Sequence, residues 1–303
     1  MIKKITCNLL LFLLIVVSNA QQTPILADYH YNKLILNPAY SGYHQNPEAV
    51  LSGRKFLSGV EGTPSTVSFT YHSPINNKKV GIGGMVTHDN IGVTSKTGIY
   101  GTYAFKLQMD YNDYPSDWYY SPQALSLGLI GGVSFYKEDL LFLNMTNDPN
   151  FQNNVNATIP SFGIGIYYNV RHFYIGFSAP NLLEPSVSKE NNIDIRSNYY
   201  FNTGYRFYAS RYFYVEPGVL LKYTNGAPLQ LDMNLVFNYF NKVEFGVGYR
   251  TTSAINLLAG FYLSDNWRMI YNFNPSINNS PLGQTHGLIL SYRFGNGFSN
   301  RLD

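Results

Sequence analysis

Apolar and polar residues alternate along most of this chain, from about residue 49 to residue 294. The final stretch, GLILSYRF, has apolar side chains at every second position, with Ser291 and Arg293 between them. The same period recurs clearly in five earlier segments: 67–72, 173–178, 201–207, 229–237 and 243–250. Because successive side chains of a β-strand point to opposite faces, each segment predicts a strand with one apolar and one polar face.

Two kinds of all-β protein contain such strands. In a secreted sandwich the apolar faces meet in a core, whereas in a membrane barrel they face lipid and the polar faces line a lumen. Segments of about 10 residues with this period, separated by turn residues, are typical of the barrel. The charged residues in mid-strand positions all take the polar face, as either architecture requires: Lys106, Arg206, Glu216, Lys222, Asp232, Glu244, Arg250, Arg268 and Arg293.

The composition favours the barrel over a secreted adhesin. Charged residues make up 13% of the chain, about half of the ~25% usual in soluble domains. Aromatic residues reach 16%, and Tyr, Asn, Ser and Gly stand where a water-facing sheet would carry Lys and Glu. The net charge of +3 indicates no strong attraction to nucleic acid.

The connections between the predicted strands supply a further criterion. Short turns near residues 169–171, 209–211, 241–242 and 264–266 alternate with longer connections at 144–158, 179–198, 223–228 and 274–285. Alternation of short periplasmic turns with longer outer loops is typical of outer-membrane barrels, and it predicts roughly fourteen strands. Two connections break the alternation, since 108–123 is long where a short turn is due and 251–253 is short where a loop is due.

The N-terminus predicts export. Lys3 and Lys4 precede an apolar run from Leu9 to Val17, and Ser18-Asn19-Ala20 is a small-x-small cleavage site. This is the pattern of a secretory signal peptide, because the apolar run is far shorter than the ~20 residues of a spanning helix. Residues 1–20 are therefore expected to be removed near Ala20. The only cysteine is Cys7, so the mature chain is predicted to have no disulfide and no thiol site.

Residues 21–47 show neither strand nor helix periodicity, and the barrel is predicted to span 48–294 with a C-terminal tail at 295–303. The segment is nevertheless rich in Tyr, Leu and Ile and poor in charge, so we expect part of it to pack into the periplasmic mouth or the lumen. Asn37 and Pro38 are expected to set a fixed turn in it.

Glycines within strands at 81–84 and 163–165 lack a following helix, which argues against phosphate binding. They are expected to ease curvature or make room for something inside.

No metal, cofactor or catalytic motif is predicted. The six histidines are dispersed, and none stands at ligand spacing from a second one. His72 and His172 are expected to face the lumen as hydrogen-bonded side chains. Ser, His and Asn are numerous, but no local motif supports a hydrolase.

Several segments, in order along the mature chain, resemble the PorP/SprF family of type IX secretion. They are ILNPAYSG (35–42), VLSGRKFLSGVEGTPSTVSFTYHSPI (50–75), VGIGGMVTHDNIG (80–92), NDPNF (147–151), FYIGFSAPNLL (173–183) and LSYRF (290–294). Gly62, Pro64 and Thr66 match the Gly-x-Pro-x-Thr element of that family. The chain departs from the family pattern at two places. It has QTHG at 284–287 where the family usually has Gly-Ser-His-Glu, and Phe56 where the family commonly has Trp.

The resemblance implies a non-enzymatic outer-membrane barrel, without cofactors, of the type IX secretion and gliding machinery. It would dock or anchor exported adhesin-like cargo at the cell surface, and it would contact other secretion components and outer-membrane lipid. The motif residues are candidates for partner binding: Asn37, Pro38, Gly62, Pro64, Thr66 and His286. Two alternatives remain. One is a diffusion or uptake channel similar to the fatty-acid transporters, and the other is a barrel hydrolase with Ser, His and an acid or amide on the outer wall.

Overall fold

A computed structural model describes residues 29–57, 62–75, 78–109, 123–145, 148, 151–190, 193–210, 212–251, 254–275 and 284–298. The predicted signal peptide and its cleavage site lie outside the described residues. None of the helices in the described ranges is long and apolar enough to cross a membrane. The helical elements are η1 (Lys33–Ile35), η2 (Pro38–Tyr40), η3 (Leu140–Leu143) and α2 (Glu184–Glu190).

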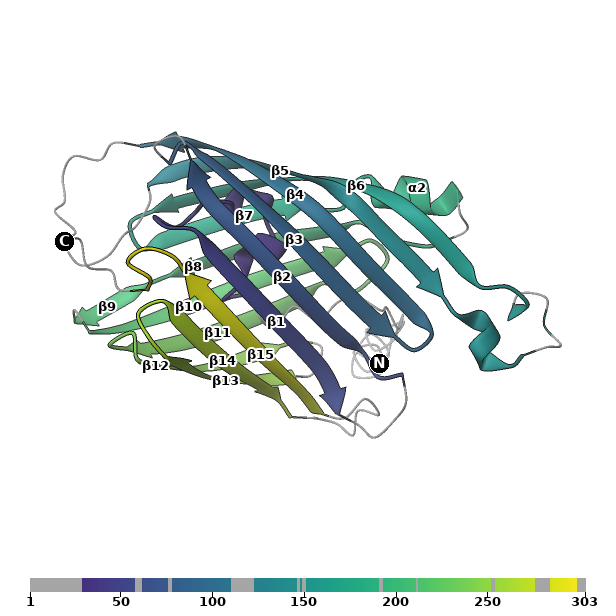
Figure 1. The fold of residues 1–303 in the computed structure, drawn as a ribbon. Coiled ribbons are helices and arrows are strands. Elements are labelled where there is room, and N and C mark those ends of the chain that lie inside the picture. Colours follow the sequence, from purple (N-terminus) through teal and green to yellow (C-terminus); the bar gives the residue numbers. More distant parts are fainter. Residues whose placement is uncertain are drawn as a thin grey trace, which may run out of the picture.

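The strands follow one another around a single wall (Figure 1). They are β1 (Glu48–Leu57), β2 (Ser65–Ile75), β3 (Val80–Ile91), β4 (Thr94–Gln108), β5 (Ala124–Glu138), β6 (Val155–Val170), β7 (Phe173–Ala179), β8 (Asn198–Tyr205), β9 (Phe207–Ser210), β10 (Phe213–Thr224), β11 (Gln230–Tyr239), β12 (Val243–Arg250), β13 (Ala254–Tyr262), β14 (Trp267–Asn274) and β15 (Gln284–Arg293).

The sheet closes on itself. Neighbouring strands pair antiparallel, and β15 pairs with β1 along the whole of β1. β8 and β9 both pair with β10 and are separated only at Arg206, so together they form one interrupted strand of the wall. The barrel therefore has fourteen wall strands, and the predicted architecture and strand number are confirmed.

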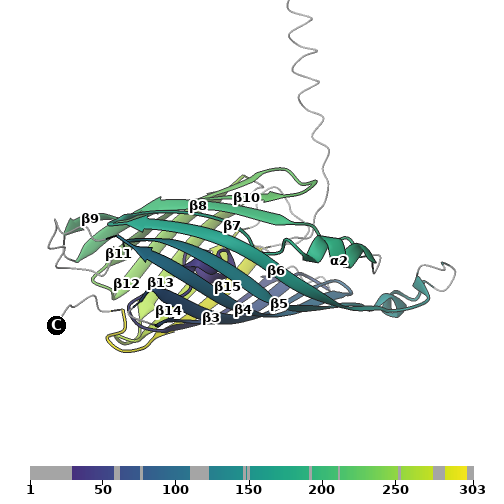
Figure 2. The same ribbon diagram turned by 90° about the horizontal axis from the view of Figure 1, so that it is seen from above.

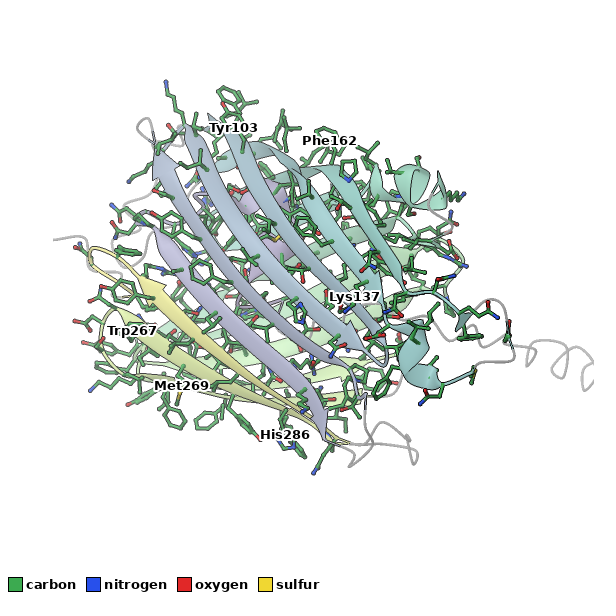
Figure 3. The ribbon with its side chains drawn as sticks, turned by 45° about the vertical axis from the view of Figure 1, so that its right-hand side comes forward. Tyr103, Lys137, Phe162, Trp267, Met269 and His286 are labelled. Atoms are coloured by element: carbon green, nitrogen blue, oxygen red, sulfur yellow. The ribbon has the colours of Figure 1, made fainter. Side chains whose placement is uncertain are left out.

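The two faces of the wall carry the predicted residue types. Leu288 is 50% exposed and Phe245 is 56% exposed, whereas Glu244, next to Phe245, is only 2% exposed. Figure 3 shows the labelled Tyr103 and Phe162 pointing away from the barrel. All of the mid-strand charges that the pattern assigned to the polar face point into the lumen. The sandwich interpretation is wrong, because one closed sheet leaves its apolar face outside for lipid.

The two ends of the barrel differ in their connections. The end that carries the starts of β1 and β3, which we call the terminal end, has connections of two to four residues at 76–79, 171–172, 211–212, 240–242 and 263–266. The opposite end, called the loop end, carries the long connections 139–154 and 180–197. Both predicted exceptions to this rule are present. The long connection 109–123 joins strands at the terminal end, and the short connection 251–253 joins strands at the loop end. Because short turns face the periplasm, the loop end faces the exterior.

Candidate functional site

Residues 29–47, which we call the lumenal segment, lie inside the barrel. Figure 2 shows the purple η1 and η2 enclosed by the strands. The two short helices are joined at Asn37, which is 1% exposed. Other side chains of the segment are buried as well: Tyr29, Tyr31, Leu34, Leu36, Ala39, Tyr40 and Ser41. The lumen is thus closed across its middle by the chain's own N-terminal part.

The turn predicted at Asn37 and Pro38 is present and has a clear local cause. The Asn37 side chain accepts a hydrogen bond from the Ala39 amide at 2.9 Å and so caps η2. Pro38 occupies the start of η2, where its missing N–H costs nothing. The Ser41 hydroxyl ends the helix by donating to the Pro38 carbonyl at 2.8 Å, and it accepts from the Thr102 hydroxyl of β4 at 2.7 Å.

Hydrogen bonds attach the segment to the wall. The Asn37 amide donates to the Ile166 carbonyl of β6 at 2.9 Å and to the Phe177 carbonyl of β7 at 3.3 Å. From β7, the Ser178 hydroxyl donates to the Leu36 carbonyl at 2.6 Å. The Asn37 and Ser178 side chains are buried, so removing a partner would leave an unsatisfied group at a cost of about 1–3 kcal/mol each.

Glycines of the inner wall allow the segment to approach the strands. A Cβ at Gly128 of β5 would lie 2.5 Å from the Ala39 Cα, and one at Gly165 of β6 would lie 3.0 Å from the Asn37 Cγ. A Cβ at Gly81 of β3 would lie 2.9 Å from the backbone of Gly42. Side chains at these wall positions would overlap the segment, which confirms the expectation that inward glycines make room for something packed inside.

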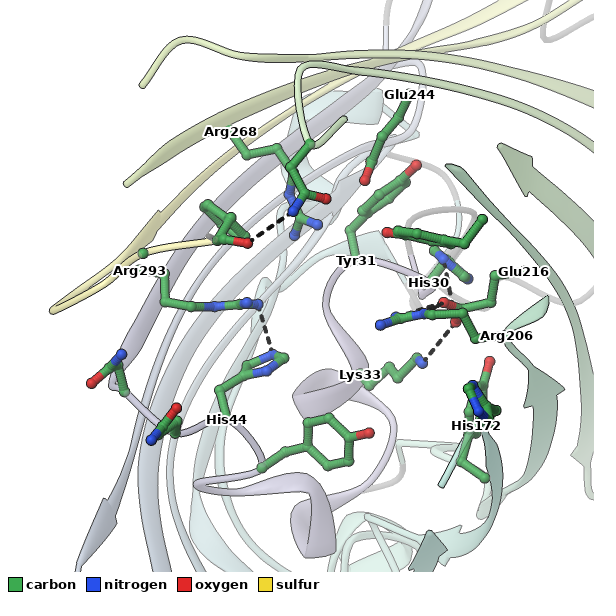
Figure 4. A pocket seen from close by; sticks show the side chains of 18 of the residues that line it. His30, Tyr31, Lys33, His44, His172, Arg206, Glu216, Glu244, Arg268 and Arg293 are labelled. Atoms are coloured by element: carbon green, nitrogen blue, oxygen red, sulfur yellow. Dashed lines mark hydrogen bonds and ion pairs between the residues drawn. The ribbon is translucent and has the colours of Figure 1, made fainter. Parts of the chain in front are cut away.

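Ion pairs on the terminal side hold the segment as well. Glu216 of β10 forms ion pairs with Arg206 at 2.6 Å and with Lys33 of the segment at 3.6 Å, and the His30 ring of the segment lies 3.6 Å from the same carboxylate. The Lys33 ammonium also lies 3.7 Å from the centre of the Tyr174 ring. Burial lowers the pKa of Lys33 to about 8, against the opposing attraction of Glu216. Figure 4 shows this group around Glu216.

A second charged group surrounds Glu48, at the start of β1. His44 of the segment lies 2.8 Å from this carboxylate and Arg293 of β15 lies 3.2 Å from it, with Arg268 and His72 at 3.7 and 3.9 Å. Ligand atoms of His44, Glu48 and His72 lie within 4.8 Å of one another, as in a metal site. However, the Arg293 guanidinium lies 3.0 Å from the Nε2 atom of His44. A cation therefore already holds these donors, and a second one would be repelled.

Residues after the last strand turn inward at the terminal end and line the cavity there, which sequence reasoning missed. Phe298 is 4% exposed, and its ring lies between the guanidinium groups of Arg268 and Arg293, at 4.6 and 4.3 Å from the ring centre. Its amide donates to the Asp265 carbonyl at 2.7 Å. Gly297, with φ of +65°, allows the chain to turn inward at this point. The signal that could have found it was a large aromatic among small polar residues.

The predicted partner-binding residues lie in three separate places. Asn37 and Pro38 are enclosed in the lumen, where they order the lumenal segment. Gly62, Pro64 and Thr66 lie at the loop end, where the Gly62 carbonyl accepts from the Gly92 amide at 2.8 Å. His286 points outward from β15 (Figure 3) and lies 2.5 Å from the Tyr271 hydroxyl. Their roles in binding partners stay predictions.

Cavities lie on both sides of the lumenal segment. The terminal-side cavity, drawn in Figure 4, measures about 120 Å³ and is lined by Lys33, Arg206 and Phe298 among others. His172 also lines this cavity, so its predicted position on the lumen side is confirmed, as is that of the buried His72. The loop-side cavity is larger, about 460 Å³, and Ile35 of η1 contributes to its floor.

A closed fourteen-strand barrel with an apolar outer band and a polar, partly filled lumen defines an outer-membrane β-barrel protein. A sequence model of one family of such proteins, described as "Type IX secretion system membrane protein PorP/SprF", matches residues 18–292. The chain belongs to this family and resides in the outer membrane, as a member of the type IX secretion machinery. The resemblance seen in the sequence is thereby confirmed.

Comparisons beyond the family are distant. No curated protein sequence matches the chain. Among solved structures, the Acinetobacter baumannii outer membrane protein Omp33 is 8% identical, with 84% of this chain and 100% of that one covered and a TM-score of 0.48. A Pseudomonas aeruginosa FadL homologue is 13% identical, with coverages of 86% and 93% and a TM-score of 0.44.

Proposed function

We propose that this chain is a non-enzymatic docking protein that holds exported, adhesin-like cargo at the cell surface. It would contact other type IX secretion components and the surrounding outer-membrane lipid. The observation that carries this proposal is the closure of the lumen by residues 29–47. A protein that passes solutes needs an open or gated lumen, whereas a docking protein needs only a rigid frame that presents its rims to partners.

The manner of closure supports a permanent rather than a loose plug. The lumenal segment is bonded to β4 through Ser41, to β6 and β7 through Asn37, and to β10 through Lys33. It also contributes buried apolar side chains to three separate clusters, such as Leu36 with Tyr200 and Leu220. Burial of each larger side chain is worth roughly 1.5–3 kcal/mol. The segment is therefore a structural part of the lumen.

Deletion of residues 23–43 tests the proposal. The fourteen wall strands are left intact, so the variant is expected to insert, with the heat-modifiable gel migration of a folded barrel. Its conductance in planar bilayers is expected to rise, because the two cavities would join. Its co-purification with secretion components and cargo from native membranes is expected to fall. The matched control is the full chain, for which we expect a low conductance.

The uptake channel remains the second candidate, and one observation favours it. Residues of η1 line both cavities, with Lys33 at the terminal-side cavity and Ile35 at the loop-side cavity. A displaced segment would leave a continuous path. If the intact protein already conducts as a wide pore, docking by a closed barrel is wrong and the channel is the better assignment.

A further inference from the structure

The loop-side cavity has the dimensions of a ligand site. Its volume of about 460 Å³ falls within the ~300–1,000 Å³ typical of small-molecule pockets. It extends from the exposed Arg196 at the rim down to Ile35 of the lumenal segment. Threonine, serine and asparagine side chains form the largest group in its lining. The cavity therefore opens toward the exterior and offers neutral hydrogen-bonding groups among apolar side chains.

Aromatic rings supply flat walls. Tyr100, Tyr136 and Tyr200 line the cavity from three different strands. Tyr100 packs over Gly98, where a Cβ would lie 2.5 Å from the Cζ of its ring, and its hydroxyl is held by a hydrogen bond with Ser134 at 2.8 Å. A ring fixed before a ligand arrives loses little conformational freedom on binding.

Most charged groups of the cavity are neutralised within the protein. Lys96 pairs with Glu184, the first residue of α2, at 2.7 Å, and Ser134 donates to the other oxygen of Glu184 at 2.9 Å. At the rim, Arg196 pairs with Asp194 at 2.9 Å. These pairs leave the cavity with little demand for a charged ligand.

Two polar groups have unused hydrogen-bonding capacity. Asp89 of β3 lies opposite Lys96 in the strand register, yet that lysine is bonded to Glu184. Within the described residues Asp89 makes no ion pair, and it accepts one hydrogen bond, from Thr66 at 2.7 Å. Ser161 of β6 is 5% exposed and its hydroxyl has no partner among the described residues. Since a carboxylate can accept several hydrogen bonds, donors from a ligand fit here.

We propose that this cavity binds a neutral saccharide unit from the exterior. Sugar hydroxyls would donate to Asp89 and exchange hydrogen bonds with Ser161 and the surrounding threonines. The apolar face of the sugar ring would pack on the tyrosines, of which Tyr100 is already fixed. An organic amine would satisfy Asp89 alone and leave the neutral polar lining unused. A saccharide site would add recognition of surface glycans to a protein of the secretion machinery.

The test uses the full mature chain in lauryldimethylamine oxide micelles, because detergents with sugar head groups would compete. Saturation-transfer NMR is recorded with the methyl glycosides of glucose, galactose, mannose and N-acetylglucosamine, and separately with cyclohexylammonium. At least one glycoside is expected to show transfer. Thr87→Phe fills the cavity from β3 and is expected to abolish the signal. Val86→Phe, on the lipid face of the same strand, is the matched control and is expected to leave the signal unchanged.

A second pair of variants tests the carboxylate. Asp89→Asn keeps an acceptor for Thr66 but loses the charge, so the glycoside should bind about fivefold more weakly, the difference between a charged and a neutral hydrogen bond. Asp265→Asn, at an exposed position on the opposite end of the barrel, should have no effect. Three results would overturn the proposal: no transfer to any glycoside in a folded wild-type protein, transfer to cyclohexylammonium alone, or equal loss of signal in Thr87→Phe and Val86→Phe.

Discussion

A single methyl group on the inner wall should displace the lumenal segment without harming the barrel. Gly128 and Gly131 both lie on β5, but Gly128 faces Ala39 inside and Gly131 faces outward. A Cβ at Gly131 meets no atom within 4 Å, whereas one at Gly128 would lie 2.5 Å from the Ala39 Cα. Gly128→Ala and Gly131→Ala therefore make the same chemical change in one strand and differ only in what the new methyl meets.

The size of the effect follows from overpacking. The atom that Gly128→Ala meets is backbone of a segment bonded to the wall on several sides, so it cannot rotate away. Insertion of a methyl group into such packing typically costs about 1–3 kcal/mol. Because each 1.4 kcal/mol is a factor of ten, the displaced population should rise roughly 5- to 140-fold. Gly131→Ala should leave that population unchanged.

Cysteine labelling measures this population. The mature chain is expected to contain no cysteine, so Ser41→Cys introduces a single thiol at a buried position of the segment. The thiol reacts with a water-soluble maleimide only when the segment leaves the wall. The labelling rate is therefore proportional to the fraction of molecules in which the lumenal segment is displaced. Labelling should be faster in the Gly128→Ala background than in the Gly131→Ala background. Equal rates in two folded variants would show that the glycine does not position the segment.

Two further predictions concern the wall and the pH response. Phe245→Arg should lower the amount of heat-modifiable barrel, since Arg near the bilayer midplane costs roughly 2–4 kcal/mol. The neighbouring Glu244→Gln faces the lumen and should still assemble. Equal loss of barrel in both variants would contradict the assigned faces. Burial lowers the pKa of His44 to about 3 and that of His30 to about 4. In the released segment both histidines have pKa values near 6.5, so between about pH 4 and pH 6.5 it binds more protons than the docked segment does. Docking is therefore most stable above about pH 6.5, and it weakens as the pH falls toward 4. Bilayer conductance should therefore rise reversibly between pH 7 and pH 4, and a flat response would contradict this.

Features with a local signal were predictable from the sequence. Two-residue alternation depends only on neighbouring side chains, so it gave the strands, their faces and the two irregular connections. The turn at Asn37 and Pro38 follows from a capping side chain and a fixed φ. Glycines inside strands indicated that the inner wall approaches another part of the chain closely.

Features that depend on distant residues were not predictable. Glu48 and Arg293 are 245 positions apart, and only the closed register of β1 with β15 brings them together. The interruption at Arg206 and the inward turn at Phe298 likewise depend on contacts across the barrel. The resemblance supplied positions for partner binding but no distances, so it could not show that Asn37 lies inside the lumen and His286 on the outer wall.

The charged group at Glu48 joins the first strand, the last strand and the lumenal segment, and this has a consequence for the order of assembly. β15 supplies Arg293, β14 supplies Arg268 and the lumenal segment supplies His44. The seam between β1 and β15 is the last part of the wall that synthesis can complete, because its two strands lie at opposite ends of the chain. A seam that closed around an empty lumen would bury Arg293 without His44 beside it. The end of the lumenal segment that carries His44 is therefore expected to reach its place before the seam closes.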